Sequence, residues 1–153
     1  MIQLPNLIVD DAVAAIILNK NKQYLLQLRD DYPHIYFPGR WGLFGGAIEK
    51  NETELDAIRR ELYEELEFQP KDIDFFSRFN FDINNGEKQI NYFRSYFICN
   101  INDDEATNLK LHEGKNYGFY SEDKILTSMQ LTPYDYYSIW THSNLYRLKI
   151  KER

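Results

Sequence analysis

Two apolar runs near the N-terminus are separated by a short polar segment. Ala12–Leu18 and Tyr24–Leu28 are rich in aliphatic and β-forming residues, and residues 19–22 between them are polar. We therefore predict a β-hairpin. Residues 30–40, with two prolines and a glycine, are predicted to form a loop. Residues 41–48 contain three glycines, which favours a backbone that bends or closely approaches another group.

The clearest helical pattern covers residues 53–66. Thr53 followed by Asp56 fits a capping box at the helix start, and Pro70 lies just beyond the expected end. Four apolar residues recur at helical spacing and form one predicted stripe: Leu55, Ile58, Leu62 and Leu66.

The second half of the chain reads as strands followed by a helix. Strands are predicted at 74–81 and 89–99, with a polar turn at 84–86 between them. A short strand at 118–121 and a helix at 133–145 complete the pattern. The fold class is therefore α/β, with a strand order that the pattern does not define.

Length and composition fit one folded domain. The 153 residues contain no internal repeat and no linker, so we expect a single domain over 1–153. Hydrophobic residues make up 43% of the chain, which excludes a disordered tail. With 18 basic and 24 acidic residues the net charge is −6, so binding to polymeric nucleic acid is not expected.

Other classes are excluded by what the chain lacks. Cys99 is the single cysteine, and the three histidines are widely spaced, which argues against a disulfide framework and a zinc site. The run at Ala12–Leu18 is too short to cross a bilayer. We therefore expect a soluble cytoplasmic protein without a membrane partner. A homodimer is compatible with the sequence.

Three glutamates share one side of the predicted helix. Glu61, Glu64 and Glu65 are spaced i, i+3 and i+4, so their carboxylates repel one another unless a cation lies between them. Carboxylate oxygens are hard ligands that suit Mg²⁺ or Mn²⁺. Taken alone, a solvated acidic helix face explains the same cluster better than a metal site does.

The register of this cluster with upstream residues favours the metal site. Gly46 is followed after five residues by Glu52, and seven residues later by the run Arg60-Glu61-Leu62-Tyr63-Glu64-Glu65-Leu66-Glu67-Phe68. This arrangement resembles the Nudix box of the MutT/Nudix hydrolase family at eight of its nine specified positions. The upstream run of residues 41–46 also resembles the family's usual approach to the box.

The resemblance implies a Nudix fold, an α/β/α sandwich around a mixed β-sheet. It implies that Glu61, Glu64 and Glu65 bind Mg²⁺, with Mn²⁺ as an alternative ion, and that the carbonyl of Gly45 is a further ligand. Glu113, in a later loop, is a candidate outer ligand, although an ordinary loop acid explains it equally well. The resemblance also pairs Arg60 with Glu52, and makes one glutamate, Glu61 or Glu64, a general base.

The implied reaction is hydrolysis of a diphosphate linkage in a small nucleotide-like molecule, since a bound metal neutralises phosphate and activates water. Nucleotide sugars and ordinary or oxidised nucleoside triphosphates stay open, because signatures of several other substrate classes are absent. Arg29, Arg40 and Tyr117 are candidate substrate contacts, by phosphate clamping or base stacking. Further candidates for these two tasks are Arg78, Arg94, Tyr32, Tyr36, Phe37 and Trp41.

Two positions depart from the family pattern. Glu67 stands where the family has glycine, and a left-handed backbone there would cost on the order of 1 kcal/mol. Phe44 stands where many members have proline. Two alternatives to an active hydrolase remain: a Nudix-fold sensor that binds a nucleotide without turnover, and a structural domain whose acidic helix is a coincidence.

Overall fold

The computed structural model describes residues 10–84, 86 and 89–145. Within these residues six strands form one mixed sheet in the order β3-β2-β1-β5-β4, and β6 pairs with β2. The strands are β1 Ala12–Leu18, β2 Tyr24–Leu28, β3 Trp41–Gly42, β4 Asp74–Asn84, β5 Gln89–Asn100 and β6 Asn116–Tyr120. The helices are α1 Glu54–Leu66, α2 Asp103–Thr107, α3 Glu122–Ser128 and α4 Pro133–Asn144.

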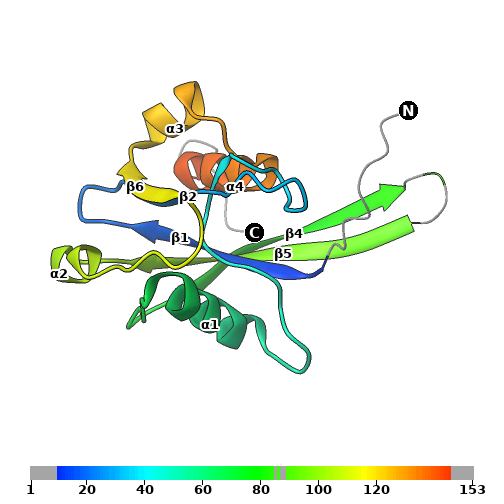
Figure 1. The fold of residues 1–153 in the computed structure, drawn as a ribbon, viewed down its shortest axis with the longest axis horizontal. Helices are drawn as coiled ribbons and strands as arrows, with labels where there is room; N and C mark the ends of the chain where they lie inside the picture. The colour runs from blue at the N-terminus through cyan, green and yellow to red at the C-terminus, as the bar shows by residue number, and fades with distance from the viewer. Residues whose placement is uncertain (1–9, 85, 87–88, 146–153) are drawn as a thin grey trace.

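The layers confirm the α/β/α sandwich. Helix α1 covers one face of the sheet, and α3 and α4 cover the other (Figure 1). Strand β1 is parallel to β5, while β1–β2, β2–β3, β2–β6 and β4–β5 are antiparallel, so the sheet is mixed. Apolar side chains of alternating residues along β1 pack on each side: Val13, Ala15 and Ile17 against α1, and Ala14 and Ile16 on the opposite side.

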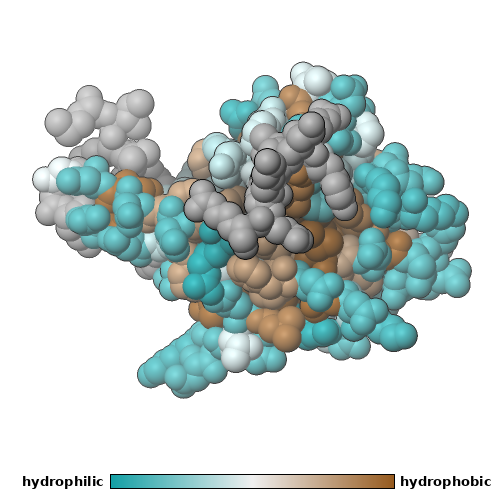
Figure 2. All heavy atoms as spheres, turned by 180° about the vertical axis from the view of Figure 1, so that it is seen from behind, coloured by the Kyte–Doolittle hydropathy of each residue, from teal (hydrophilic) through white to brown (hydrophobic). Residues whose placement is uncertain are grey.

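The β4–β5 ribbon extends beyond the helices that cover the rest of the sheet (Figure 1). Strand β4 is longer than its sequence pattern predicted, because antiparallel pairing with β5 continues to Asn84, and β5 ends one residue later than predicted, at Asn100, which pairs with Leu18 of β1. Seen from behind, the molecule has an apolar area in the middle of that face, bordered by hydrophilic side chains (Figure 2). The sandwich thus leaves some large apolar side chains in solvent, among them Phe75, Tyr137 and Trp140.

Residues 41–47 lie between β1 and β2, which separate beyond their hairpin. Trp41 and Gly42 pair with the end of β2, and the chain then crosses to β1, where Phe44 bridges Ala15 and Ala47 bridges Ala12. The N–H groups of Ala15 and Val13 donate to the carbonyls of Phe44 and Gly46, both at 2.9 Å. The glycine-rich segment thereby becomes part of the sheet and leads directly into α1.

Helix α1 begins and ends close to the predicted positions. The Thr53 hydroxyl accepts from the Asp56 N–H and donates to the Asp56 carboxylate, so Asp56 supports the cap through the hydroxyl and not in the reciprocal way that was predicted. Ile58, Leu62 and Leu66 are fully buried against the sheet. Leu55 does not belong to the buried stripe, since it lies in the first turn and is 42% exposed.

Two short helices, α2 and α3, were not predicted from the pattern. Each has only five to seven residues, too few to show a helical period, and each begins after a capping side chain, Asn102 or Ser121. The predicted turn at 84–86 includes Asn85, which lies outside the described residues. In the described part of the chain, no helix has the length and apolar character needed to cross a membrane.

Candidate active site

A cavity of about 480 Å³ opens where the glycine-rich segment meets α1 and β5. Its lining includes Gly45, Gly46 and Ala47 from this segment and Glu113 and Gly114 from the loop before β6. All three glutamates that the helix pattern singled out also line it: Glu61, Glu64 and Glu65. The fold therefore brings the predicted helix cluster and Glu113 to one cavity, although 48 residues separate Glu65 from Glu113 in the sequence.

Glu65 is the buried member of the helix cluster. It is 4% exposed, and its carboxylate accepts from the Gly45 N–H at 2.9 Å. Burial first, and then the charge of Glu61, raise the pKa of the Glu65 carboxyl to about 8. A carboxylate in this position stays ionised at neutral pH only if a cation compensates its charge.

Gly45 has no room for a side chain. Its φ is 138°, and a Cβ would lie 2.2 Å from the Val13 carbonyl oxygen. The carbonyls of Phe44 and Gly46, on either side, are bonded to β1. Gly45 thereby holds its N–H against Glu65 while its own carbonyl takes no part in the bridge to β1.

Arg60 connects the helix glutamates to the loop before the helix. Its Nε and Nη2 donate to the two oxygens of Glu52 at 2.8 and 2.9 Å, the pairing implied by the family resemblance. Its Nη1 donates to Glu61 at 2.8 Å and to Glu64 at 3.1 Å. These bonds to Arg60, and then the Glu49 N–H, lower the pKa of Glu52 to about 2.

Glu61 and Glu64 differ in their surroundings. Burial raises the pKa of Glu61, against the opposing effect of Arg60, and Glu113 adds repulsion. The Glu64 side chain is 57% exposed at the rim. Among the described residues, no three acidic, histidine or cysteine side chains converge closely enough to hold a metal ion as they stand.

The chemistry of this group of donors nevertheless fits a hard divalent cation. Glu61, Glu65 and Glu113 line one cavity; burial first, and then repulsion by neighbouring glutamates that include Glu113, raises the pKa of both helix carboxyls. A cation between them would remove this repulsion, and carboxylate oxygens are the ligands that Mg²⁺ and Mn²⁺ prefer.

Glu67 ends helix α1 in the left-handed conformation, with φ 54° and ψ 29°. Its N–H donates to the Tyr63 carbonyl and the Phe68 N–H to the Leu62 carbonyl, a helix ending that usually uses glycine. The Glu67 carboxylate contacts Lys110 at 2.8 Å and His112 at 2.9 Å. The residue that departs from the box therefore ties the helix end to the segment leading into Glu113.

The other candidate contacts fall in different places. Arg29 lines the cavity, and its Nε donates to the Tyr36 carbonyl at 3.0 Å. Arg40 bonds Gln130 in solvent, and Tyr117 packs against the core on the α1 side, so neither contributes to the cavity lining. Arg78 pairs with Glu54 outside the cavity. Of the aromatic candidates, Tyr36 lines the cavity; Tyr32, Phe37 and Trp41 do not.

Sequence reasoning missed several lining residues. Tyr92, Tyr134, Asp10, Asp30 and Gln27 line the same cavity but carry no motif. Tyr92 and Arg94 are two residues apart on one strand and so share a face. That polar pair on a strand beside an apolar run is the one signal the sequence offered.

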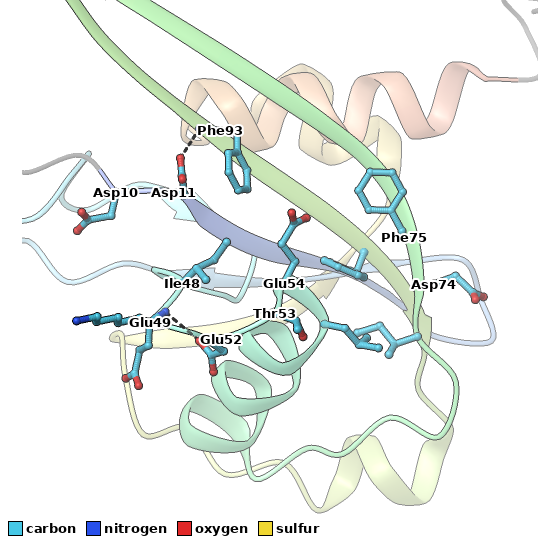
Figure 3. Close-up of a pocket in the computed structure, with 14 residues that line it drawn as sticks. Asp10, Asp11, Ile48, Glu49, Glu52, Thr53, Glu54, Asp74, Phe75 and Phe93 are labelled. Carbon is cyan, nitrogen blue, oxygen red and sulfur yellow. Dashed lines mark hydrogen bonds between the residues drawn. The ribbon is translucent and has the colours of Figure 1, made fainter.

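A larger hollow of about 860 Å³ lies on the other side of the loop that leads into α1, residues 47–53, here called the box loop. The hollow lies between the start of α1 and the β4–β5 ribbon (Figure 3). Its floor includes Ile48, Phe75 and Phe93, and the Glu49 N–H donates to Glu52 at its edge. None of Glu61, Glu64 and Glu65 lines it. Chemistry therefore selects the smaller cavity as the candidate active site.

A profile of the NUDIX domain matches residues 9–138. The chain belongs to the Nudix family. This confirms the resemblance drawn from the box, and the match includes the box loop, α1 and the Glu113 loop.

The Nudix chain is also similar to named proteins. The nucleoside triphosphatase NudI of Escherichia fergusonii is 43% identical over 54 residues, and this match spans 35% of the chain and 37% of that relative. The NudI of an Enterobacter species matches over the same length at 43% identity.

Solved structures share the Nudix fold. The MutT protein from Methanosarcina mazei Go1 has a TM-score of 0.71 at 24% identity, over 93% of this chain and 99% of that one. The NUDIX domain of Shewanella oneidensis NrtR, solved with ADP ribose, has a TM-score of 0.70 at 17% identity, over 93% and 90%. Likeness at these identities confirms the fold.

Proposed function

We propose that this chain is a divalent-metal-dependent hydrolase that cleaves a diphosphate linkage in a nucleoside diphosphate derivative. The substrate classes we consider are nucleotide sugars and nucleoside triphosphates. The observation that carries the proposal is the single cavity in which Glu61, Glu64 and Glu65 meet Gly45 and Glu113. The match to NudI, a nucleoside triphosphatase by name, adds support for a nucleoside triphosphate.

The ion we propose is Mg²⁺, with Mn²⁺ as a substitute, and when bound it neutralises phosphate oxygens and lowers the pKa of a water molecule. Glu61, Glu64 and Glu65, with Glu113 and the Gly45 carbonyl, are the proposed ligands. Arg60 holds the box loop through Glu52 and, in the metal-free state, compensates the charges of Glu61 and Glu64.

The reaction proposed for the cavity is attack by water oxygen on a phosphorus of the anhydride. The bond from that phosphorus to the bridging oxygen breaks, and the bridging oxygen leaves on the second phosphate. The proton released from water passes to Glu61 or Glu64, a carboxylate within the cavity. We also propose that residues 1–153 act as one domain, since the described strands form one sheet covered by helices on both faces.

The test is chromatographic detection of the nucleoside mono- or diphosphate formed from nucleoside triphosphates, nucleotide sugars and dinucleotides, with Mg²⁺, with Mn²⁺ and with EDTA. We expect turnover that requires the ion and that Glu64→Gln or Glu65→Gln abolishes, while both variants stay folded. Glu49→Gln serves as the matched control, because Glu49 belongs to the box loop but lines only the other hollow. Full activity of both cavity variants would contradict the proposal.

A second candidate is nucleotide binding without turnover. It is favoured by the observation that, in the described residues, no three acidic groups converge for a metal, and a domain of similar fold was solved with ADP ribose. Tight nucleotide binding by calorimetry, with no product from any substrate or ion, would select this reading over hydrolysis.

A further inference from the structure

Arg94 is an arginine that lines the cavity although its side chain is almost wholly buried. It lies on β5 and is 9% exposed. Its Nε has no hydrogen-bond partner among the described residues. A guanidinium carries five N–H donors, and a buried donor without an acceptor costs free energy. Nε faces a protein carboxylate, so a ligand that brings acceptors into the cavity would bond the four N–H donors of the two terminal nitrogens.

Two neighbours fix the guanidinium in place. The Asp135 carboxylate lies 3.4 Å from Nε, and Asp135 is itself held by the Leu43 N–H and the Thr132 hydroxyl, both at 2.9 Å. Arg94 Cζ lies 4.7 Å from the centroid of the Tyr134 ring. With Nε facing Asp135 and one face against the ring, the terminal nitrogens are the donors that a ligand can reach.

Arg94 lies at some distance from the helix glutamates. It pairs with Ala12 on β1, and Ala12 bridges Ala47 of the box loop. Two strand spacings separate the Arg94 backbone from that loop by about 10 Å. Three tyrosines line the cavity with Arg94: Tyr36, Tyr92 and Tyr134. This spacing leaves room for a nucleotide with its diphosphate at the glutamates and its nucleoside among the tyrosines.

The charge balance also favours a base over a phosphate. The buried Asp135 carboxylate lies 3.4 Å from Arg94 Nε and already compensates the charge of Arg94. A phosphate would therefore meet a nearly neutral ion pair and would be repelled by the Asp135 carboxylate. A neutral base with acceptor atoms meets no such repulsion, and its ring can stack on tyrosine.

We infer that Arg94 is a specificity-determining residue that reads the base of the nucleotide and favours guanine or cytosine over adenine. This rests on the hydrolase function proposed above. Two parallel N–H groups of a guanidinium match two adjacent acceptors, as guanine presents with N7 and O6 and cytosine with N3 and O2. Adenine presents an amino donor beside N7, which would face a donor of Arg94.

The first experiment measures kcat/KM for GTP, CTP and ATP with Mg²⁺, in the natural protein and in Arg94→Lys. We expect the natural protein to prefer GTP and CTP by about 10-fold or more, the discrimination of one bidentate contact. Lysine keeps the charge and loses the two parallel donors. Arg94→Lys should therefore lose most of its activity on GTP and CTP and keep that on ATP within about 3-fold.

The matched control is Arg78→Lys. Arg78 also stacks on an aromatic ring, with Cζ 4.4 Å from the Phe93 centroid, but lies outside the cavity. The Arg78→Lys variant should therefore keep the base preference of the natural protein. An equal fall for all three nucleotides in Arg94→Lys would indicate a phosphate contact or a structural role and would overturn the inference.

A second experiment does not depend on turnover or on a variant that folds. Calorimetry on the natural protein in EDTA compares the binding of GMP, CMP and AMP. We expect GMP and CMP to bind at least several-fold more tightly than AMP, and equal affinities would overturn the inference. If no nucleotide is hydrolysed but GMP and CMP are still preferred, the hydrolase proposal fails and base recognition by this cavity stands.

Discussion

Removing divalent ions should make the stability of this protein depend on pH through Glu65. Its carboxyl has a pKa of about 8 in the folded state, raised first by burial and then by Glu61, against an ordinary value of 4.5. Between these values the folded protein binds one more proton than the unfolded chain. The stabilisation is therefore full below pH 4.5 and is lost as the pH rises through 8.

The expected slope is about 1.4 kcal/mol per pH unit for one proton, or about 4 kcal/mol between pH 5 and pH 8 as an upper limit. For a chain of this length, 1 kcal/mol corresponds to about 2–4 °C in Tm. The Tm in EDTA should then fall by about 3–5 °C for each pH unit. The raised pKa of Glu61 acts in the same direction.

The assay is thermal unfolding in EDTA from pH 5 to pH 8, with the natural protein and Glu65→Gln side by side. Glutamine keeps an oxygen that accepts from the Gly45 N–H and cannot ionise. The two proteins should unfold at similar temperatures at pH 5, and the variant should be the more stable at pH 8. Excess Mg²⁺ should restore the Tm of the natural protein at pH 8, because the ion binds the ionised carboxylate.

Glu64→Gln is the control for removing one negative charge from the helix, since the Glu64 side chain is 57% exposed. Its Tm difference from the natural protein should be constant over the same range. The reasoning is refuted if the difference between Glu65→Gln and the natural protein is the same at pH 5 and pH 8.

Two further substitutions test the backbone around the site. Gly45→Ala should destabilise the protein by at least about 3 kcal/mol in urea unfolding, because its Cβ would meet the Val13 carbonyl. Gly86→Ala, also at positive φ but with open space around it, should cost far less. Equal losses of stability in the two variants would contradict the steric explanation. Glu67→Ala should unfold about 2–4 °C below Glu67→Gly, because both lose Lys110 and His112 while only alanine keeps left-handed strain. An alanine variant as stable as the glycine one would contradict this.

The helix and the cluster of glutamates on one of its sides were predictable because both follow from local spacing. Glutamates at positions i, i+3 and i+4 share a side in any helix. The spacing of Gly46, Glu52 and Arg60 relative to these glutamates indicated the Nudix family. The left-handed backbone suspected at Glu67 is present. Its compensation was not predictable, since Lys110 and His112 approach only through the folded chain.

The opposite end of the cavity was not predictable, for a physical reason. Asp135 lies in a helix rich in tyrosine and reads as an ordinary first-turn acid, yet the fold buries it against Arg94, 41 residues earlier. Arg40 and Tyr117 looked as suitable as Arg29, but in the folded chain Arg40 bonds Gln130 and Tyr117 packs against the core. The proposed nucleotide subsite combines the loop after β2, strand β5 and helix α4, and no sequence spacing links these three segments.

The glycine-rich segment holds two buried carboxylates from opposite layers of the sandwich: Glu65, which lines the cavity, and Asp135, which pairs with the cavity residue Arg94. The Leu43 N–H donates to Asp135 of α4, and two residues later the Gly45 N–H donates to Glu65 of α1, both at 2.9 Å. A Cβ on Gly42 would lie 2.9 Å from the Asp135 oxygen, and one on Gly46 would lie 2.6 Å from Glu61. The glycines thus make room for carboxylates at both ends of the segment. In our proposals the carboxylates near Gly46 hold the metal, and Asp135 near Gly42 holds Arg94. Because one segment positions both, a shift of residues 42–46 should disturb catalysis and base preference together, whereas a change at Arg94 alone should leave catalysis on ATP intact.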